Sequence, residues 1–144
     1  LAAFVSRLDE PFGEWKGGDT LNEDAITLPW FAPSPVVLDF VQAAYEHGLV
    51  VPFEWSDWMA AGGRDLVFAA PEAMAGLSLA DVQRVATAII RGDRFSEGTL
   101  AEAFEDGRMP ALIRRLAVLA AHDLFAELNA RLRAAETRLL SSGL

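Results

Sequence analysis

The sequence predicts a mainly α-helical domain of the α+β class with a small β-hairpin near its N-terminus. Apolar residues recur at three- and four-residue spacing in residues 35–47, 79–91 and 110–140, which is typical of helices that cover a core. Alternation of apolar and polar residues, typical of a half-buried strand, occurs near the N-terminus. We expect residues 1–144 to form one domain, with a hairpin and aromatic half over 1–60 and a helical half over 78–140.

The composition indicates a chain that folds by itself and excludes several classes of protein. Hydrophobic residues make up 52% of the chain, the net charge is −9 and there is no cysteine. Proteins that bind nucleic acid by neutralising phosphates carry basic surfaces instead, and an acidic chain is equally unsuited to an anionic membrane. No apolar run approaches the roughly 18–20 residues that span a bilayer. We therefore expect a cytoplasmic protein without cofactor or bound metal.

The hairpin is predicted from two short segments separated by turn residues. Residues 12–16 alternate apolar with polar or small residues, and Gly17, Gly18 and Asp19 follow them. Residues 25–31 form the second predicted strand. Because Pro29 has no N–H to donate, this strand is expected at a sheet edge or to end there.

Two helices have clear start signals. Ser34 followed by Pro35 predicts a capping hydroxyl and a proline at the first helical position, with an apolar stripe that we assign to residues 37, 38, 41, 44 and 45. Ser78 with Asp81 predicts a second capped start, and the glycines at 48 and 92 predict where the two helices end. Ser56 is expected to cap a shorter helix between them.

The rest of the chain is predicted to be helical. A helix beginning at Ser96 or Thr99 is expected to end at Gly107, and a run opened by Pro110 continues to about residue 140. The apolar stripe of that run changes phase near His122, which predicts a bend or break. The last helix, residues 123–140, is amphipathic, so it either packs on a second copy of the chain or covers its own core.

The sharpest candidate site is a charged cluster between two predicted helices, formed by Arg91, Asp93, Arg94 and Glu97. If Ser96 caps a helix, the free N–H groups of that helix and the two guanidinium groups favour a phosphate or carboxylate ligand. The alternative is structural, with the charges complementing helix ends and pairing with other residues.

Aromatic residues are concentrated in the first 60 residues, and three tryptophans, Trp15, Trp55 and Trp58, are candidates for the wall of a ligand pocket. Large aromatic residues also serve as ordinary core residues. His47 precedes a glycine at a helix end, where it is either a ligand-binding group or a charge that complements that helix end.

Three segments together resemble a family of bacterial domains of unknown function. They are residues 12–15 (FGEW), residues 45–55 (YEHGLVVPFEW) and residues 91–100 (RGDRFSEGTL). The resemblance covers roughly residues 1–120 and implies a small, cytoplasmic, bacterial protein. It implies no activity, because the family has none assigned.

The sequence therefore favours a binding module for an anionic small molecule or a peptide. One alternative is a hydrolase or transferase acting on a phosphate- or carboxylate-bearing substrate, in which Asp93 or Glu97 is the acid or base and Arg91 and Arg94 hold the anion. Another is an interaction protein that forms a homodimer through its C-terminal helix. No nucleophile–base pair is evident, which favours binding over catalysis.

Overall fold

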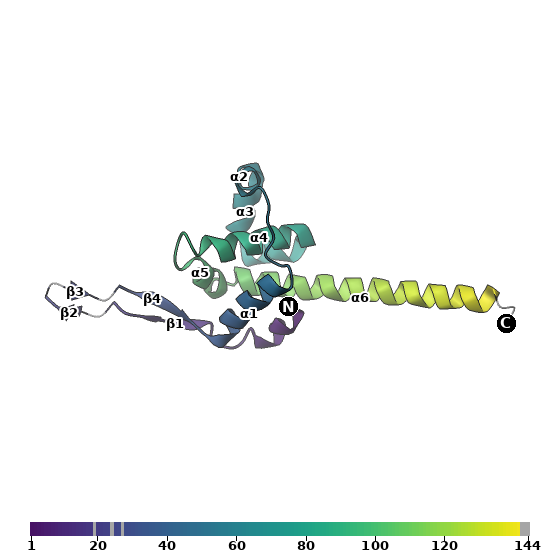
Figure 1. Cartoon of the computed structure of the whole chain (residues 1–144), viewed down its shortest axis with the longest axis horizontal. Coiled ribbons are helices and arrows are strands. Elements are labelled where there is room, and N and C mark those ends of the chain that lie inside the picture. Colours follow the sequence, from purple (N-terminus) through teal and green to yellow (C-terminus); the bar gives the residue numbers. More distant parts are fainter. Residues whose placement is uncertain (19, 24, 27, 142–144) are drawn as a thin grey trace.

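The computed structural model describes residues 1–18, 20–23, 25–26 and 28–141 and confirms a mainly helical fold with an N-terminal hairpin (Figure 1). The hairpin and the last helix project from a helical body in opposite directions. The elements in chain order are η1 (Ala2–Arg7), β1 (Gly13–Lys16), β2 (Thr20–Asn22), β3 (Ala25–Ile26), β4 (Trp30–Pro33), α1 (Pro35–Glu46), α2 (Trp55–Trp58), η2 (Met59–Gly63), α3 (Arg64–Val67), η3 (Pro71–Gly76), α4 (Leu79–Gly92), α5 (Thr99–Glu105) and α6 (Arg108–Ser141).

The hairpin is formed where it was predicted, but its second strand is interrupted. β1 pairs antiparallel with β4, with Gly13 opposite Pro33 and Lys16 opposite Trp30, and β2 pairs with β3 farther out. Residues 25–31 thus contribute to two strands, and Pro29 lies between them. A proline without an N–H cannot continue the ladder, so the pairing resumes only at Trp30.

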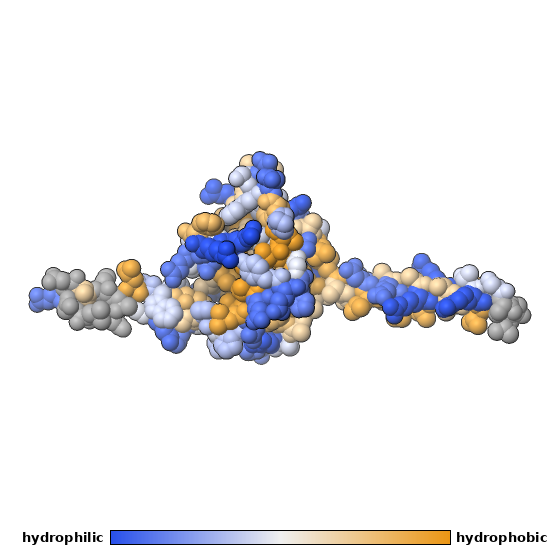
Figure 2. Space-filling view, in the orientation of Figure 1, coloured by the Kyte–Doolittle hydropathy of each residue, from blue (hydrophilic) through white to orange (hydrophobic). Residues whose placement is uncertain are grey.

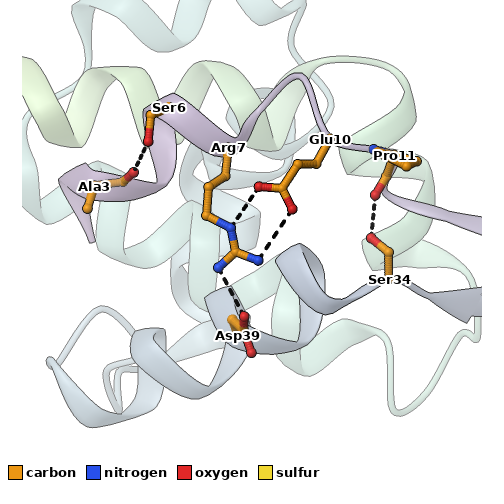
Figure 3. A network of polar contacts seen from close by, with 7 residues as sticks. All are labelled: Ala3, Ser6, Arg7, Glu10, Pro11, Ser34 and Asp39. Atoms are coloured by element: carbon orange, nitrogen blue, oxygen red, sulfur yellow. Dashed lines mark hydrogen bonds and ion pairs between the residues drawn. The ribbon is translucent and has the colours of Figure 1, made fainter.

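Helix α1 begins at Pro35 as expected, but its predicted cap is wrong and its predicted core stripe is only partly correct. The Ser34 hydroxyl does not cap the helix and instead donates a hydrogen bond to the Pro11 carbonyl, which joins the helix start to the base of the hairpin (Figure 3). The buried face is formed by residues 36, 37, 40 and 44. Leu38 and Tyr45, predicted to be buried, are 55% and 43% exposed.

The segment between α1 and α4 is an extended stretch followed by short helices, of which α3 contacts α4. The helix α2 begins at Trp55, so Ser56 lies within it and is not its cap. Gly62 has a φ of 109°, a conformation that favours glycine, and it interrupts the helical path between α2 and α3. Gly63 lies beneath the Trp58 ring, where an added Cβ would come within 2.3 Å of the ring.

Helix α4 runs through the middle of the core and follows its sequence signals at both ends. The Ser78 hydroxyl accepts a hydrogen bond from the Asp81 N–H, as predicted, and the helix ends at Gly92. The buried Thr87 hydroxyl accepts a hydrogen bond from the Val51 N–H at 3.0 Å. This contact fixes the extended segment after α1 against α4.

The C-terminal run is one continuous helix, and the predicted bend near His122 is wrong. α6 starts at Arg108, two residues before Pro110, and continues through Ser141. Its first part is buried, at residues 108–110, 112, 113 and 116. Farther along, the helix leaves the body (Figure 1). A change of stripe phase does not bend this helix, because its later residues have no core to follow.

An ion-pair network ties the N-terminal turn to α1. The Arg7 guanidinium donates to Glu10 at 2.9 Å and to Asp39 at 3.0 Å (Figure 3). Both hydrogen bonds raise the pKa of Arg7, and the one with Glu10 has the larger effect. The network is exposed, so it orients η1 more than it stabilises the fold.

Candidate functional site

The best-formed cavity lies between the base of the hairpin, one face of α1 and the start of α5. Its volume is about 390 Å³, which is within the range of pockets that hold small molecules or peptide side chains. Most of its wall is apolar, and its two charged residues, Asp93 and Glu97, are both acidic. The full lining is Phe31, Pro33, Val37, Leu38, Val41, Gln42, Asp93, Glu97, Gly98, Leu100 and Ala101.

The loop that contributes the acids is held by the side chain of Asp93. One oxygen of this carboxylate accepts hydrogen bonds from the N–H groups of Gly98 and Leu100, both at 3.1 Å. Gly98 has a φ of 97° and occupies the N-cap position of α5. The Thr99 hydroxyl donates to the Ser96 carbonyl at 2.7 Å, which closes the loop further. These hydrogen bonds hold the loop in one conformation and place the Asp93 carboxylate at the start of α5.

Helix α5 begins at Thr99, one of the two predicted starts, but the predicted caps are wrong. Neither Ser96 nor Thr99 caps the helix; Gly98 precedes it and Asp93 supplies the side-chain acceptor. Capping carboxylates stabilise a helix N-terminus by accepting N–H groups that have no partner within the helix. Asp93 occupies the place where the sequence predicted an external phosphate or carboxylate.

Only two of the four residues of the charged cluster line the pocket. Asp93 and Glu97 line the pocket, whereas Arg91 and Arg94 are exposed and do not line it. Within the described part of the chain, neither arginine takes part in an ion pair, so the predicted structural pairing of Arg94 is absent there. Of this cluster, the pocket therefore includes the acids and not the arginines.

Of the three candidate tryptophans, Trp15 lies beside the pocket. Its ring packs on Phe31 with centroids 5.4 Å apart, and its outer edge lies 3.7 Å from the position of a Cβ at Gly98. Trp58 packs instead on Phe53, with centroids 5.5 Å apart, and contacts the core. Neither Trp55 nor Trp58 is among the residues that line the cavity. The hairpin and the charged loop therefore meet, while α2 is not part of that site.

His47 lies at the C-terminal end of α1, where its N–H donates to the Ala43 carbonyl. It is exposed and does not line the pocket. The described residues contain no group of three or more His, Asp or Glu side chains that is arranged to hold a metal ion. In the same residues no helix is both long enough and apolar enough to cross a membrane.

Sequence reasoning missed the apolar wall of the pocket, which includes Phe31, Leu38, Val41 and Leu100. One signal was available: the apolar residues of α1 extend around more of the helix than a single buried face requires. Residues 36, 37, 40 and 44 already cover the core, so Leu38 lines a second surface, to which Val41 also contributes although it packs on the core. The approach of β4 and α5 to that surface is a long-range feature that no local pattern contains.

The comparisons with known proteins identify a family without an assigned activity. A family model described as "Family of unknown function (DUF6508)" matches residues 1–122. No curated protein and no solved structure matches the chain. The matched region contains the whole pocket and ends within α6, beyond the last buried residue of that helix, Leu116.

Proposed function

We propose that this chain, which belongs to the family of unknown function DUF6508, is a binding module whose pocket accepts an apolar, positively charged segment of a peptide. The observation that carries this proposal is the pocket itself, an apolar wall with Asp93 and Glu97 as its only charged lining residues among those described. Apolar walls supply most of the affinity of such sites, and a few polar groups fix the orientation of the ligand.

The electrostatics of the chain support a cationic ligand. The net charge of −9 creates a negative field that attracts basic partners. Glu97 is exposed at the pocket, so an arginine or lysine of a peptide can reach it. An apolar side chain of the same peptide would lie against Leu38 and Leu100. The proposal places this interaction in the bacterial cytoplasm, as the composition and the family resemblance suggest.

The experiment uses two synthetic helical peptides with the same leucine pattern, one with arginines and one with glutamates at the remaining positions. We expect the arginine peptide to bind and to shift the amide resonances of Leu38, Gly98 and Leu100. Leu38→Ala should weaken binding about tenfold, by loss of apolar contact, and Glu97→Gln a few-fold. Leu79→Ala, at an exposed leucine of α4 outside this pocket, should leave affinity unchanged. Equal binding of the two peptides contradicts the proposal.

An anionic small molecule remains the alternative derived from the sequence. The side chains that support it, Arg91 and Arg94, are exposed on the loop outside the pocket. Inorganic phosphate and a panel of sugar phosphates test it directly, because a ligand bound to the folded state raises its apparent stability. A thermal shift that is lost in Arg94→Ala would favour the anion over the cationic peptide.

The hydrolase or transferase alternative depends on the acids of the same loop. Asp93 is held by two backbone N–H groups and fixes the start of α5. Glu97 is then the better candidate for a general acid or base. Turnover of a phosphate- or carboxylate-bearing substrate that is lost in Glu97→Gln, with binding retained, would support catalysis.

A second proposal concerns a different surface, the projecting part of α6, through which we propose that two copies associate. It is supported by the exposure of large apolar residues there, with Leu124, Leu128 and Leu132 between 53% and 68% exposed. Light scattering of the intact protein tests it, since a mass of 15.6 kDa at high concentration would contradict association.

A further inference from the structure

The projecting part of α6, here called the tail, consists of residues 124–141. It extends beyond the body as a straight helix (Figure 1), and it lies outside the region that the family model matches. Every one of its residues is exposed or half-buried. Isolated helices are marginal in water, and most helical stability in proteins comes from packing of an apolar face. The tail therefore needs a packing partner that the body does not provide.

The apolar face of the tail is not a continuation of the face that packs on the body. The buried face of α6 contains Leu112, Ile113 and Leu116. At 3.6 residues per turn, that face continues through the charged residues Asp123 and Glu127 and then through the small residues Ala130 and Ala134, with no large apolar side chain.

The apolar residues of the tail lie elsewhere on the helix. Leu124, Leu128, Leu132 and Ala135 fall within about 80° of one another and about 100° from the buried face. Apolar residues reach the surface on both the body and the tail (Figure 2). The tail stripe thus lies to the side of the face that packs on the body, and its leucines are exposed to another helix.

The spacing of this stripe has approximate two-fold symmetry along the chain. Leu128 and Leu132 are equidistant from residue 130, and Leu124 and Ala135 are placed almost symmetrically outside them. Two copies in antiparallel orientation would set each Leu128 against Leu132 of the other copy. The larger Leu124 would face the smaller Ala135, which suits close packing.

The charges of the tail favour the same orientation. Residues 121–128 contain the acids Asp123 and Glu127 and no lysine or arginine, whereas residues 129–141 contain three arginines and one acid, Glu136. A parallel pair would set acids beside acids and arginines beside arginines. An antiparallel pair sets the acidic end of each tail beside the basic end of the other.

One ion pair marks the centre of this arrangement. Glu127 and Arg131 are paired within the helix, and the midpoint between them is residue 129. A two-fold axis near residue 130 brings Glu127 of each copy beside Arg131 of the other, so the charges alternate across the axis. The centre of the stripe and the centre of the ion pair therefore differ by one residue.

We propose that the tail pairs antiparallel with the tail of a second copy of this chain, about a two-fold axis near residue 130. The inference rests on the self-association proposed above and specifies its partner and orientation. The two bodies then lie at opposite ends of the paired helices, which leaves both pockets open. The surface is separate from the pocket, so peptide binding and self-association are tested independently.

Mass measurement by light scattering on the intact chain is the first test. We expect about twice 15.6 kDa for the wild type and a monomer for Leu128→Glu combined with Leu132→Glu. Both residues are exposed and lie outside the core, so the thermal unfolding of the body should not change. Leu38→Glu, an equally exposed leucine on α1, is the control and should remain a dimer. A monomeric wild type, or a double variant that stays dimeric, overturns the proposal.

Disulfide trapping then determines the orientation, because the chain has no cysteine of its own. Leu124→Cys and Ala135→Cys are prepared as separate proteins that differ in mass through a tag. In the antiparallel pair, the substituted positions of two Leu124→Cys copies are about 18 Å apart along the axis and those of two Ala135→Cys copies about 15 Å apart, so neither protein should cross-link with itself. The mixture should give the mixed dimer in good yield. Self-cross-linking of each protein alone indicates parallel pairing and overturns the proposed orientation.

Discussion

The two ends of α6 have the same secondary structure and opposite surroundings. Near its start, Leu112 is 1% exposed and belongs to the core cluster, whereas Leu132 in the tail is 59% exposed. The start of the helix is held by the body, and the tail requires contacts from outside it. The comparison shows that helical periodicity alone does not reveal where an apolar face is buried.

The largest expected difference in the free energy of unfolding is between substitutions of two leucines in α6. Leu112→Ala should lower the free energy of unfolding of the body by about 3 kcal/mol, through lost burial and a residual cavity. Leu132→Ala should change it by less than about 0.5 kcal/mol, because the residue is exposed. Urea unfolding at low protein concentration measures both. Equal losses would mean that the tail folds back on the body.

The next largest difference in the free energy of unfolding is expected between substitutions of two arginines in α6. Arg108 is buried, and its guanidinium donates to the Val67 carbonyl at 2.6 Å and to Asp106 at 2.8 Å. Arg108→Ala should cost about 2 kcal/mol, because it leaves the carbonyl without its charged donor. Arg131→Ala, which removes an exposed pair with Glu127, should cost about 0.3–0.5 kcal/mol. A larger cost at Arg131 than at Arg108 would contradict the contrast, and the same unfolding titration measures it.

The smallest difference in the free energy of unfolding is expected between substitutions of two acidic residues in the pocket loop. Asp93→Ala removes the acceptor of two N–H groups at the start of α5 and should cost about 1 kcal/mol. Glu97→Ala, in the same loop but exposed, should cost less than about 0.5 kcal/mol. Thermal unfolding monitored by circular dichroism measures both variants. If the two losses are equal, Asp93 is not the residue that holds the loop.

Local signals in the sequence predicted much of the fold. Ser78 caps α4 and Pro35 begins α1, because each signal acts within one turn of the residue that carries it. One of the two predicted starts of α5, Thr99, is correct. Its cap was not predicted, since Asp93 reaches across the loop from five and seven residues away. The residues of the pocket were only partly among the candidates. Its acids and the neighbouring Trp15 belong to conspicuous segments, but Leu38 becomes part of a wall only when β4 and α5 approach α1.

Hydrogen exchange of the intact protein at a series of concentrations tests most directly whether the tail is held by a second copy. We expect the amides of residues 124–141 to be protected at high concentration and to lose protection on dilution, while those of α4 stay protected throughout. The buried α4 residues provide the internal reference within the same sample. Protection of the tail that does not depend on concentration would contradict the account.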